Sequence, residues 1–180
     1  FDTERMDIFL VELFGDVNLQ DLPIPLSAVA VDLLTSEVVV LREGRAAAAV
    51  RASCAVPGIF PPVEIDGRLL IDGGVVDNLP VSVVRQMGAD YVIAVDLMQS
   101  NILQRDRPRN LLEVWALSLF ILMRNAQHEA GLADIVLVPD TASHSWVDVA
   151  NARRLIERGR EAAEAALPAI LRDLGREDAR

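Results

Sequence analysis

The triplet Asp72-Gly73-Gly74 is the point in this sequence where residue types and spacing could do chemistry. An aspartate carboxylate can act as a general base toward a hydroxyl group, and adjacent glycines let the backbone turn without a side chain in the way. Taken alone, Asp-Gly is an ordinary turn dipeptide, and such a triplet occurs by chance about 0.06 times in a chain of this length. The bare triplet therefore favours a turn.

The flanking sequence changes that interpretation. Residues 51–62 (RASCAVPGIFPP) precede the triplet, residues 67–80 (GRLLIDGGVVDNLP) contain it, and residues 88–96 (GADYVIAVD) follow it. This order of motifs resembles the patatin-like phospholipase family, and within it the bacterial and neuropathy-target-esterase-like branch. Residues 21–37 and 133–139 extend the resemblance over most of the chain.

The resemblance implies a two-residue mechanism. A serine in Gly-x-Ser-x-Gly attacks an ester carbonyl, and the aspartate of the Asp-Gly-Gly/Ala motif takes its proton and later activates water. Asp72 matches that aspartate. The other matching positions are expected to shape the loops around it: Gly73, Gly74, Pro57, Gly58, Asn78 and Pro80. In the segment before the site, Ser36 stands where the family usually has glycine.

None of the eight serines lies in Gly-x-Ser-x-Gly, and no glycine-rich oxyanion loop is visible. We therefore expect residues 1–180 to be the C-terminal part of a single patatin-like domain. The expected partner is a complementary N-terminal segment that carries the nucleophilic serine and the oxyanion hole. The chain alone is expected to be inactive.

Other side chains are weaker candidates. Ser53 is expected to pack in the wall of the site, and Cys54 lies in an apolar stretch that favours a buried structural thiol. His128 and His144 occur in polar contexts, and the implied dyad uses no histidine. Three further aspartates are expected to cap helices or turns: Asp77, Asp96 and Asp140.

Composition excludes several classes of partner. The net charge is −10 and the sequence pI is about 4.6, and the cations do not cluster, so nucleic acid is not expected as a partner. No metal-ligand spacing is present, so no metal or other cofactor is expected. A single cysteine excludes an intrachain disulfide.

The acidic start, residues 1–5, does not resemble a signal peptide. A cytoplasmic bacterial location is therefore expected, with peripheral membrane contact as an open alternative.

Hydrophobic periodicity predicts the elements that position these residues. Helices are expected over 3–14, 46–55, 80–87, 111–130 and 148–174, and strands over 28–33, 38–41, 63–65, 69–71, 91–95 and 135–138. The continuous apolar run 91–95 suggests a strand buried on both faces of a parallel sheet. The alternation of strands and helices predicts an α/β fold. Together with the resemblance, this gives the C-terminal portion of a patatin-like three-layer fold with a mostly parallel central sheet.

Residues 111–123 (LLEVWALSLFILM) are too few and too polar for a membrane span. A core helix is the favoured interpretation, and a lipid-facing or subunit-facing surface is the alternative. The expected function is that of a serine acyl-ester hydrolase acting on lipids, as a phospholipase A, lysophospholipase or esterase. A non-catalytic fragment that only completes a fold, a lipid acyltransferase and a homo-oligomer stay open, as do head group, acyl chain length and regiospecificity.

Overall fold

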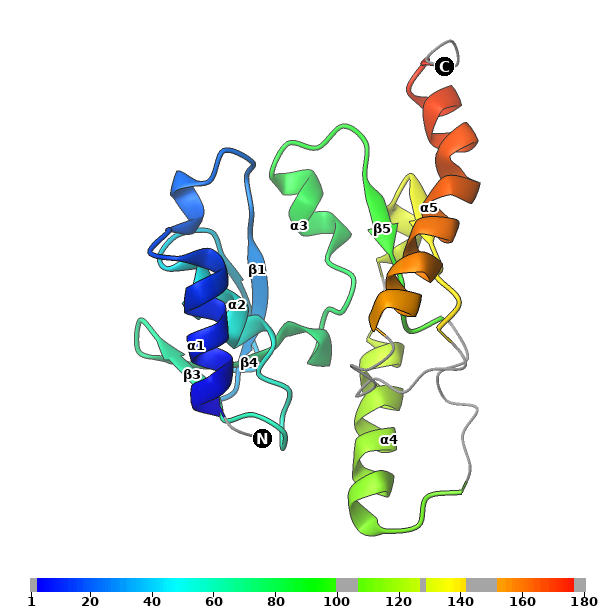
Figure 1. Cartoon of the computed structure of the whole chain (residues 1–180). Helices are drawn as coiled ribbons and strands as arrows, with labels where there is room; N and C mark the ends of the chain where they lie inside the picture. Colours follow the sequence, from blue (N-terminus) through cyan, green and yellow to red (C-terminus); the bar gives the residue numbers. More distant parts are fainter. Residues whose placement is uncertain (1–2, 100–106, 127–128, 142–151, 177–180) are drawn as a thin grey trace.

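The computed structural model describes residues 3–99, 107–126, 129–141 and 152–176 (Figure 1). Its helices, 3-10 turns and strands follow in this order: α1 (Thr3–Phe14), η1 (Leu19–Asp21), β1 (Ala28–Asp32), β2 (Val38–Leu41), α2 (Ala46–Ser53), β3 (Val63–Ile65), β4 (Arg68–Asp72), η2 (Gly73–Val75), α3 (Val81–Gln86), β5 (Ile93–Val95), α4 (Leu111–Asn125), η3 (Ala130–Leu132), β6 (Ile135–Leu137) and α5 (Ala152–Asp173). The described residues thus form an α/β fold.

The first half is built on a four-stranded sheet in the order β2-β1-β4-β3, in which every pair is antiparallel. The two hairpins predicted from the sequence, β1–β2 and β3–β4, are confirmed. In the second hairpin Asp66 and Gly67 both have positive φ, 51° and 72°, as the tight turns that join antiparallel strands require. All five residues of β1 are buried, so this strand lies at the centre of the core.

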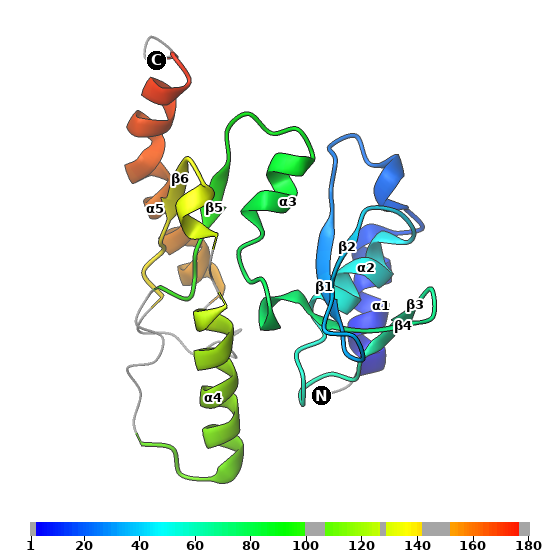
Figure 2. The same cartoon turned by 180° about the vertical axis from the view of Figure 1, so that it is seen from behind.

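Helix α2 packs on this sheet and α1 packs on α2, so that sheet, α2 and α1 form successive layers (Figures 1 and 2). Ala46, Ala49 and Ala52 recur at helical spacing and are at most 2% exposed. Their small side chains let α2 approach the sheet closely. The alanine-rich segment was expected to be a helix, and its position on the sheet explains why it needs alanines on that face.

The second half contains a two-stranded parallel sheet of β5 and β6, packed against α5. The carboxylate of Asp134 accepts hydrogen bonds from the backbone N–H of Val92 at 2.6 Å and from Arg85 at 2.5 Å, which joins α3 to this sheet. Asp96 follows β5, and its Oδ1 accepts from the N–H groups of Met98 and Gln99. Its predicted role in a turn is confirmed.

The expected mostly parallel sheet is present only in this β5–β6 pair, since the larger sheet is antiparallel. The prediction that β5 is buried on both faces is wrong for the described part of the chain, because Ile93 is 46% and Val95 50% exposed. An apolar run indicates that both faces of a strand could be buried. It does not identify the elements that cover those faces.

Helix α4 was expected to lie in the core, and its outward side contradicts that prediction. Leu111 is 83% and Leu122 63% exposed, while Met123 is buried. In α5, which runs on through Pro168, Ile170 is buried, and Leu174, which directly follows the helix, is exposed. The start of the predicted helix at 148 and most of the loop expected over 99–110 lie outside the described residues.

Candidate active site

Asp72 is the last residue of β4, next to the central strand β1. Its backbone N–H donates to the carbonyl of Ala55 at 3.1 Å. Its side-chain Oδ1 accepts from the N–H of Gly74 at 2.8 Å and so caps the 3-10 turn η2. The carboxylate is therefore fixed in place by the turn that Gly73 and Gly74 make.

Asp72 faces a cavity of about 390 Å³ at the junction of β1, α2 and η2. Five of the residues expected around the site line it: Asp72, Gly73, Gly74, Asn78 and Pro80. Its apolar wall includes Leu26, Val29 and Val50, which the sequence did not single out. They reach the site because β1 pairs with β4 and α2 packs on the sheet, and local sequence patterns carry no signal for these long-range contacts.

Burial raises the pKa of the Asp72 carboxyl above its ordinary value, and the hydrogen bond from the Gly74 N–H lowers it in part. A carboxylate whose pKa is raised is a stronger base than a solvent-exposed one. Among the described residues no donor reaches the other oxygen, Oδ2. The arrangement therefore presents one carboxylate oxygen, tuned toward proton acceptance, at the cavity wall.

The two glycines of the triplet are required by close contacts. A Cβ on Gly73 would lie 2.4 Å from the backbone oxygen of Val29, which cannot move without disturbing β1. A Cβ on Gly74 would lie 2.6 Å from Cε of Met123 and 2.7 Å from Oδ1 of Asn78. Any side chain here would displace either the central strand or the groups around Asp72.

The sequence matches the model of the patatin-like phospholipase family over residues 1–85. It is 44% identical over 105 residues to an NTE family protein of Mycobacterium bovis, across 58% of this chain and 29% of that relative. These matches support the patatin-like phospholipase family, and within it the NTE branch, for this chain. A second NTE family protein of the same organism is 36% identical over 96 residues, across 53% of this chain and 16% of that protein.

Patatin-like phospholipase domain-containing protein 7 of Rattus norvegicus is 41% identical over 87 residues, across 47% of this chain and 6% of that protein. The matched parts of this chain thus span less than a third of the length of these relatives. Asp72, Gly73 and Gly74 lie inside the segment that matches the family, residues 1–85.

Pro57 and Gly58 of this patatin-like chain do not line the Asp72 cavity. Gly58 has φ of +76°, and a Cβ there would lie 2.5 Å from Cζ2 of Trp115 in α4. The loop at Pro57 and Gly58 therefore packs against α4. Met123 of the same helix lies against Gly74, so α4 is in contact with both loops of the motif.

Ser53 and Cys54 lie in the cavity wall at the end of α2. The Ser53 hydroxyl donates to the carbonyl of Val29 at 2.7 Å, which agrees with the expected packing role. Cys54 is exposed, so the prediction of a buried thiol is wrong: α2 ends at the cavity instead of inside the core. Although the residue is exposed, desolvation of its sulfur at the cavity wall and the neighbouring Asp72 charge raise the pKa of the thiol, which disfavours a nucleophilic thiolate.

The remaining sequence candidates divide between this cavity and other parts of the chain. Asp77 lines the cavity, whereas Asp96 and Asp140 do not. His128 and His144 lie outside the described residues. Within the described ranges, no group of three or more His, Cys, Asp or Glu side chains could hold a metal ion.

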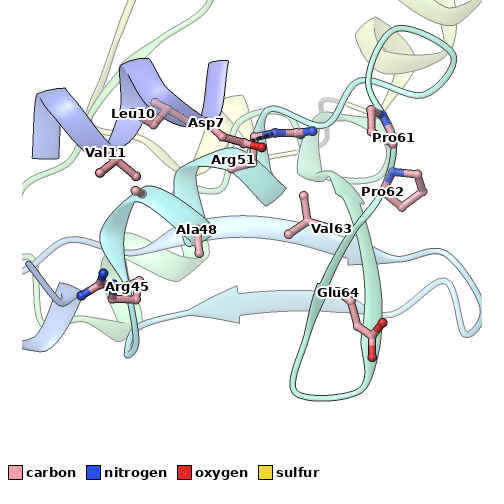
Figure 3. A pocket seen from close by; sticks show the side chains of 11 residues that line it. Asp7, Leu10, Val11, Arg45, Ala48, Arg51, Pro61, Pro62, Val63 and Glu64 are labelled. Atoms are coloured by element: carbon pink, nitrogen blue, oxygen red, sulfur yellow. Dashed lines mark hydrogen bonds and ion pairs between the residues drawn. The ribbon is translucent and has the colours of Figure 1, made fainter. Parts of the chain in front are cut away.

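A second cavity, of about 510 Å³, lies on another face of α2 against α1 and the Pro61-Pro62 turn (Figure 3). Arg51 enters it from α2 and is 6% exposed. Its Nε donates to Oδ1 of Asp7 at 2.9 Å, and its guanidinium lies 5.4 Å from the centre of the Phe60 ring. These contacts join α1 to the loop that leads to β3, and none of the expected site residues lines this cavity.

Proposed function

We propose that the intact protein hydrolyses acyl esters of lipids, with Asp72 as the general base of a Ser-Asp dyad. The observation that carries this proposal is the Asp72 carboxylate, held by Gly74 at the wall of a cavity with its pKa raised. The match of residues 1–85 to a family described as phospholipases supports lipid esters as the substrate class. The rat relative is likewise named a phospholipase domain-containing protein.

In this mechanism Asp72 Oδ2 accepts the proton of a serine hydroxyl while the serine oxygen bonds to the ester carbonyl carbon. The proton then passes from Asp72 to the departing alcohol, and an acyl-serine is left. Water attacks the acyl-serine while Asp72 takes a proton from the water. Asp72 then passes that proton to the serine oxygen as the acyl bond breaks, which frees the serine hydroxyl and the fatty acid. Asp72 thus transfers one proton in each half of the reaction and needs no histidine.

We further propose that the serine and the oxyanion hole come from a complementary N-terminal segment. The motivation is that no serine in this sequence lies in Gly-x-Ser-x-Gly. Such a segment would complete the three-layer fold and its mostly parallel sheet, with this chain as the C-terminal part of the domain. The exposed side chains of Ile93 and Val95 on β5 support a covering element there.

A second proposal follows from the same missing motif. The chain could serve as a non-catalytic piece that only completes a fold with a partner segment. The two proposals differ in what Asp72 does, because a purely structural role requires the turn at Gly73-Gly74 but no ionised carboxylate.

The test is Asp72→Asn in the intact protein, assayed on a soluble short-chain ester and on phospholipid. Asparagine can keep the hydrogen bond from Gly74 but cannot accept a proton, so we expect activity to fall by about 10²–10⁴-fold. Asp66→Asn is the matched control, because Asp66 lies in the exposed turn of the same hairpin and asparagine tolerates positive φ. Activity retained in Asp72→Asn with a normal fold would exclude the dyad and favour the non-catalytic role.

No helix in the described parts of the chain is long and apolar enough to cross a membrane. We propose a cytoplasmic protein that meets its lipid substrate by peripheral contact.

A further inference from the structure

Helix α4 carries an exposed apolar stripe along its outward side. Leu111, Val114, Ile121 and Leu122 recur at helical spacing and are 83%, 44%, 48% and 63% exposed. We call these four side chains the outer face of α4. Contiguous apolar surface of this kind marks a contact with a partner or a membrane.

Two other residues of the helix contact the site loops. Trp115 lies against Gly58, and the buried Met123 lies against Gly74. The start of the helix is also fixed, since the Asn110 side chain accepts from the Glu113 N–H at 2.9 Å and a Glu113 carboxylate oxygen accepts from the Arg109 N–H at 2.7 Å. The outer face is therefore held at the surface on a capped helix that touches the Asp72 turn.

The charge around α4 is opposite in sign to that of the whole chain. Residues 107–125 contain three arginines, Arg107, Arg109 and Arg124, and one acidic residue, Glu113, whereas the chain as a whole has a net charge of −10. The Glu113 carboxylate is occupied by the cap. Arg107 and Arg109 are exposed and lie within four residues of Leu111.

Helix α1 provides the contrast. It also exposes large apolar side chains, with Phe9 59% and Leu13 62% exposed. Its own sequence, however, contains three acidic residues and one arginine. α1 lies on the far side of the four-stranded sheet from α4 (Figures 1 and 2). An anionic surface would attract the start of α4 and repel α1.

We propose that the outer face of α4, together with Arg107 and Arg109, docks on an anionic phospholipid surface. The leucines enter the interface while the arginines pair with the headgroup phosphates. At 15 residues, α4 is about 22 Å long, too short to span a bilayer, so it lies along the interface. This inference deepens the proposed function and rests on it only for the statement that the docked lipid is also the source of substrate.

Docking of α4 on lipid would also fix the position of the Asp72 site relative to the lipid surface. Because Trp115 and Met123 seat α4 on the loops of the motif, a helix lying on lipid would hold the Asp72 turn at a fixed distance from that surface. The charge of the segment favours a lipid partner over a second copy of this acidic chain or a further acidic segment. The experiment below distinguishes a second copy of the chain and a further protein segment from lipid as the partner of this face.

The experiment is co-sedimentation of the intact protein with vesicles of phosphatidylcholine alone and of phosphatidylcholine mixed with phosphatidylglycerol. We expect stronger binding to the mixed vesicles. Leu111→Glu with Leu122→Glu, and separately Arg107→Glu with Arg109→Glu, should each weaken that binding about tenfold or more. Phe9→Glu with Leu13→Glu on α1 is the matched control and should leave binding unchanged. Circular dichroism and thermal unfolding verify that each variant is folded.

Equal binding by the α4 variants and the native protein, or no binding to mixed vesicles, overturns the proposal. If the native protein is a dimer and the leucine variant is a monomer that binds vesicles normally, the outer face joins two copies instead. If the leucine variant fails to fold while the α1 control folds, the outer face is covered by the protein itself. Vesicle binding by the Arg107→Glu, Arg109→Glu variant then tests the proposal: unchanged binding overturns it.

Failure of docking and failure of the proposed function give different results. Vesicle binding without hydrolysis of any ester would retain the docking surface and remove the catalytic proposal. Hydrolysis of a soluble short-chain ester with no vesicle binding would retain the catalytic proposal and remove the docking surface. The α4 variants should keep full activity on the soluble ester while losing activity on the mixed vesicles.

Discussion

At the scale of single residues, Asp72 combines two opposed requirements. A general base must be ionised, yet burial disfavours the ionised form and raises the pKa of this carboxyl. The turn at Gly74 offsets this in part by donating one N–H to the carboxylate. Asp72 is thus a place where the proposed activity costs stability, as functional sites commonly do.

The burial of the ionised Asp72 carboxylate predicts how the stability of the fold depends on pH. Because the folded state holds the Asp72 proton more tightly than the unfolded state, stability declines as pH rises from the ordinary aspartate pKa, about 3.9, through the raised value. Asp72→Asn removes this loss. We therefore expect the variant to melt at a higher temperature than the native protein at pH 7, and the difference to vanish below about pH 4.

Thermal unfolding at the two pH values measures this directly. The same raised pKa should place the acid limb of kcat/KM above the ordinary aspartate range, because only ionised Asp72 can accept the serine proton. A melting temperature at pH 7 that falls on substitution would show that the carboxylate stabilises the fold, contrary to this account.

At the scale of elements, the β1–β2 hairpin contains a residue that does not suit its conformation. Ser36 has φ of +63°, in the left-handed region that favours glycine. Its N–H donates to the carbonyl of Asp32, and the Asp32 side chain accepts from the N–H of Leu34, so the turn is over-determined by hydrogen bonds. The resemblance to the family had already suggested glycine at this position.

We expect Ser36→Gly to raise the free energy of unfolding by up to about 1 kcal/mol, because glycine adopts positive φ without the steric cost of a Cβ. Ser36→Ala is the matched control: it removes the hydroxyl but keeps the Cβ, and should give no gain. Urea denaturation of the three proteins measures the differences. An equal gain in both variants would assign the effect to the hydroxyl group.

The elements also show what the sequence could predict. Asp66-Gly67 between apolar runs predicted a hairpin, and the alanines of α2 predicted a helix; both depend on local backbone preferences and are confirmed. The pairing of β1 with β4, which brings Val29 to the site, depends on residues about forty positions apart and has no local signal. The same limit explains the errors at Cys54 and β5, whose burial depends on neighbours from elsewhere.

At the scale of the whole molecule, the antiparallel sheet and the parallel β5–β6 pair belong to different halves of the chain. The segment that holds Gly73, Gly74, Asn78 and Pro80 joins them, and α4 lies against it through Met123. The Asp72 cavity is formed by the first half, whereas α4 comes from the second. Both halves are therefore needed to keep the cavity in contact with the helix that lies against Gly74.

The last prediction concerns the 180 residues by themselves. Asp72 supplies a base, but within this sequence no serine lies in Gly-x-Ser-x-Gly, so the isolated chain should not hydrolyse a soluble short-chain ester above the uncatalysed rate. Adding or co-expressing a segment with that motif should restore activity, and the same segment with its serine changed to alanine should not. Intact mass of the purified material verifies which polypeptides are present.

Each result assigns the role of Asp72 separately. Hydrolysis by the isolated chain that survives Asp72→Asn would place a complete catalytic site elsewhere in these residues and remove the dyad. Activity that appears only with the complementary segment, and disappears with either the serine or Asp72 substituted, requires both groups in one site. A complex that forms with the segment but stays inactive would favour the non-catalytic role, because the turn at Gly73-Gly74 would then serve folding alone.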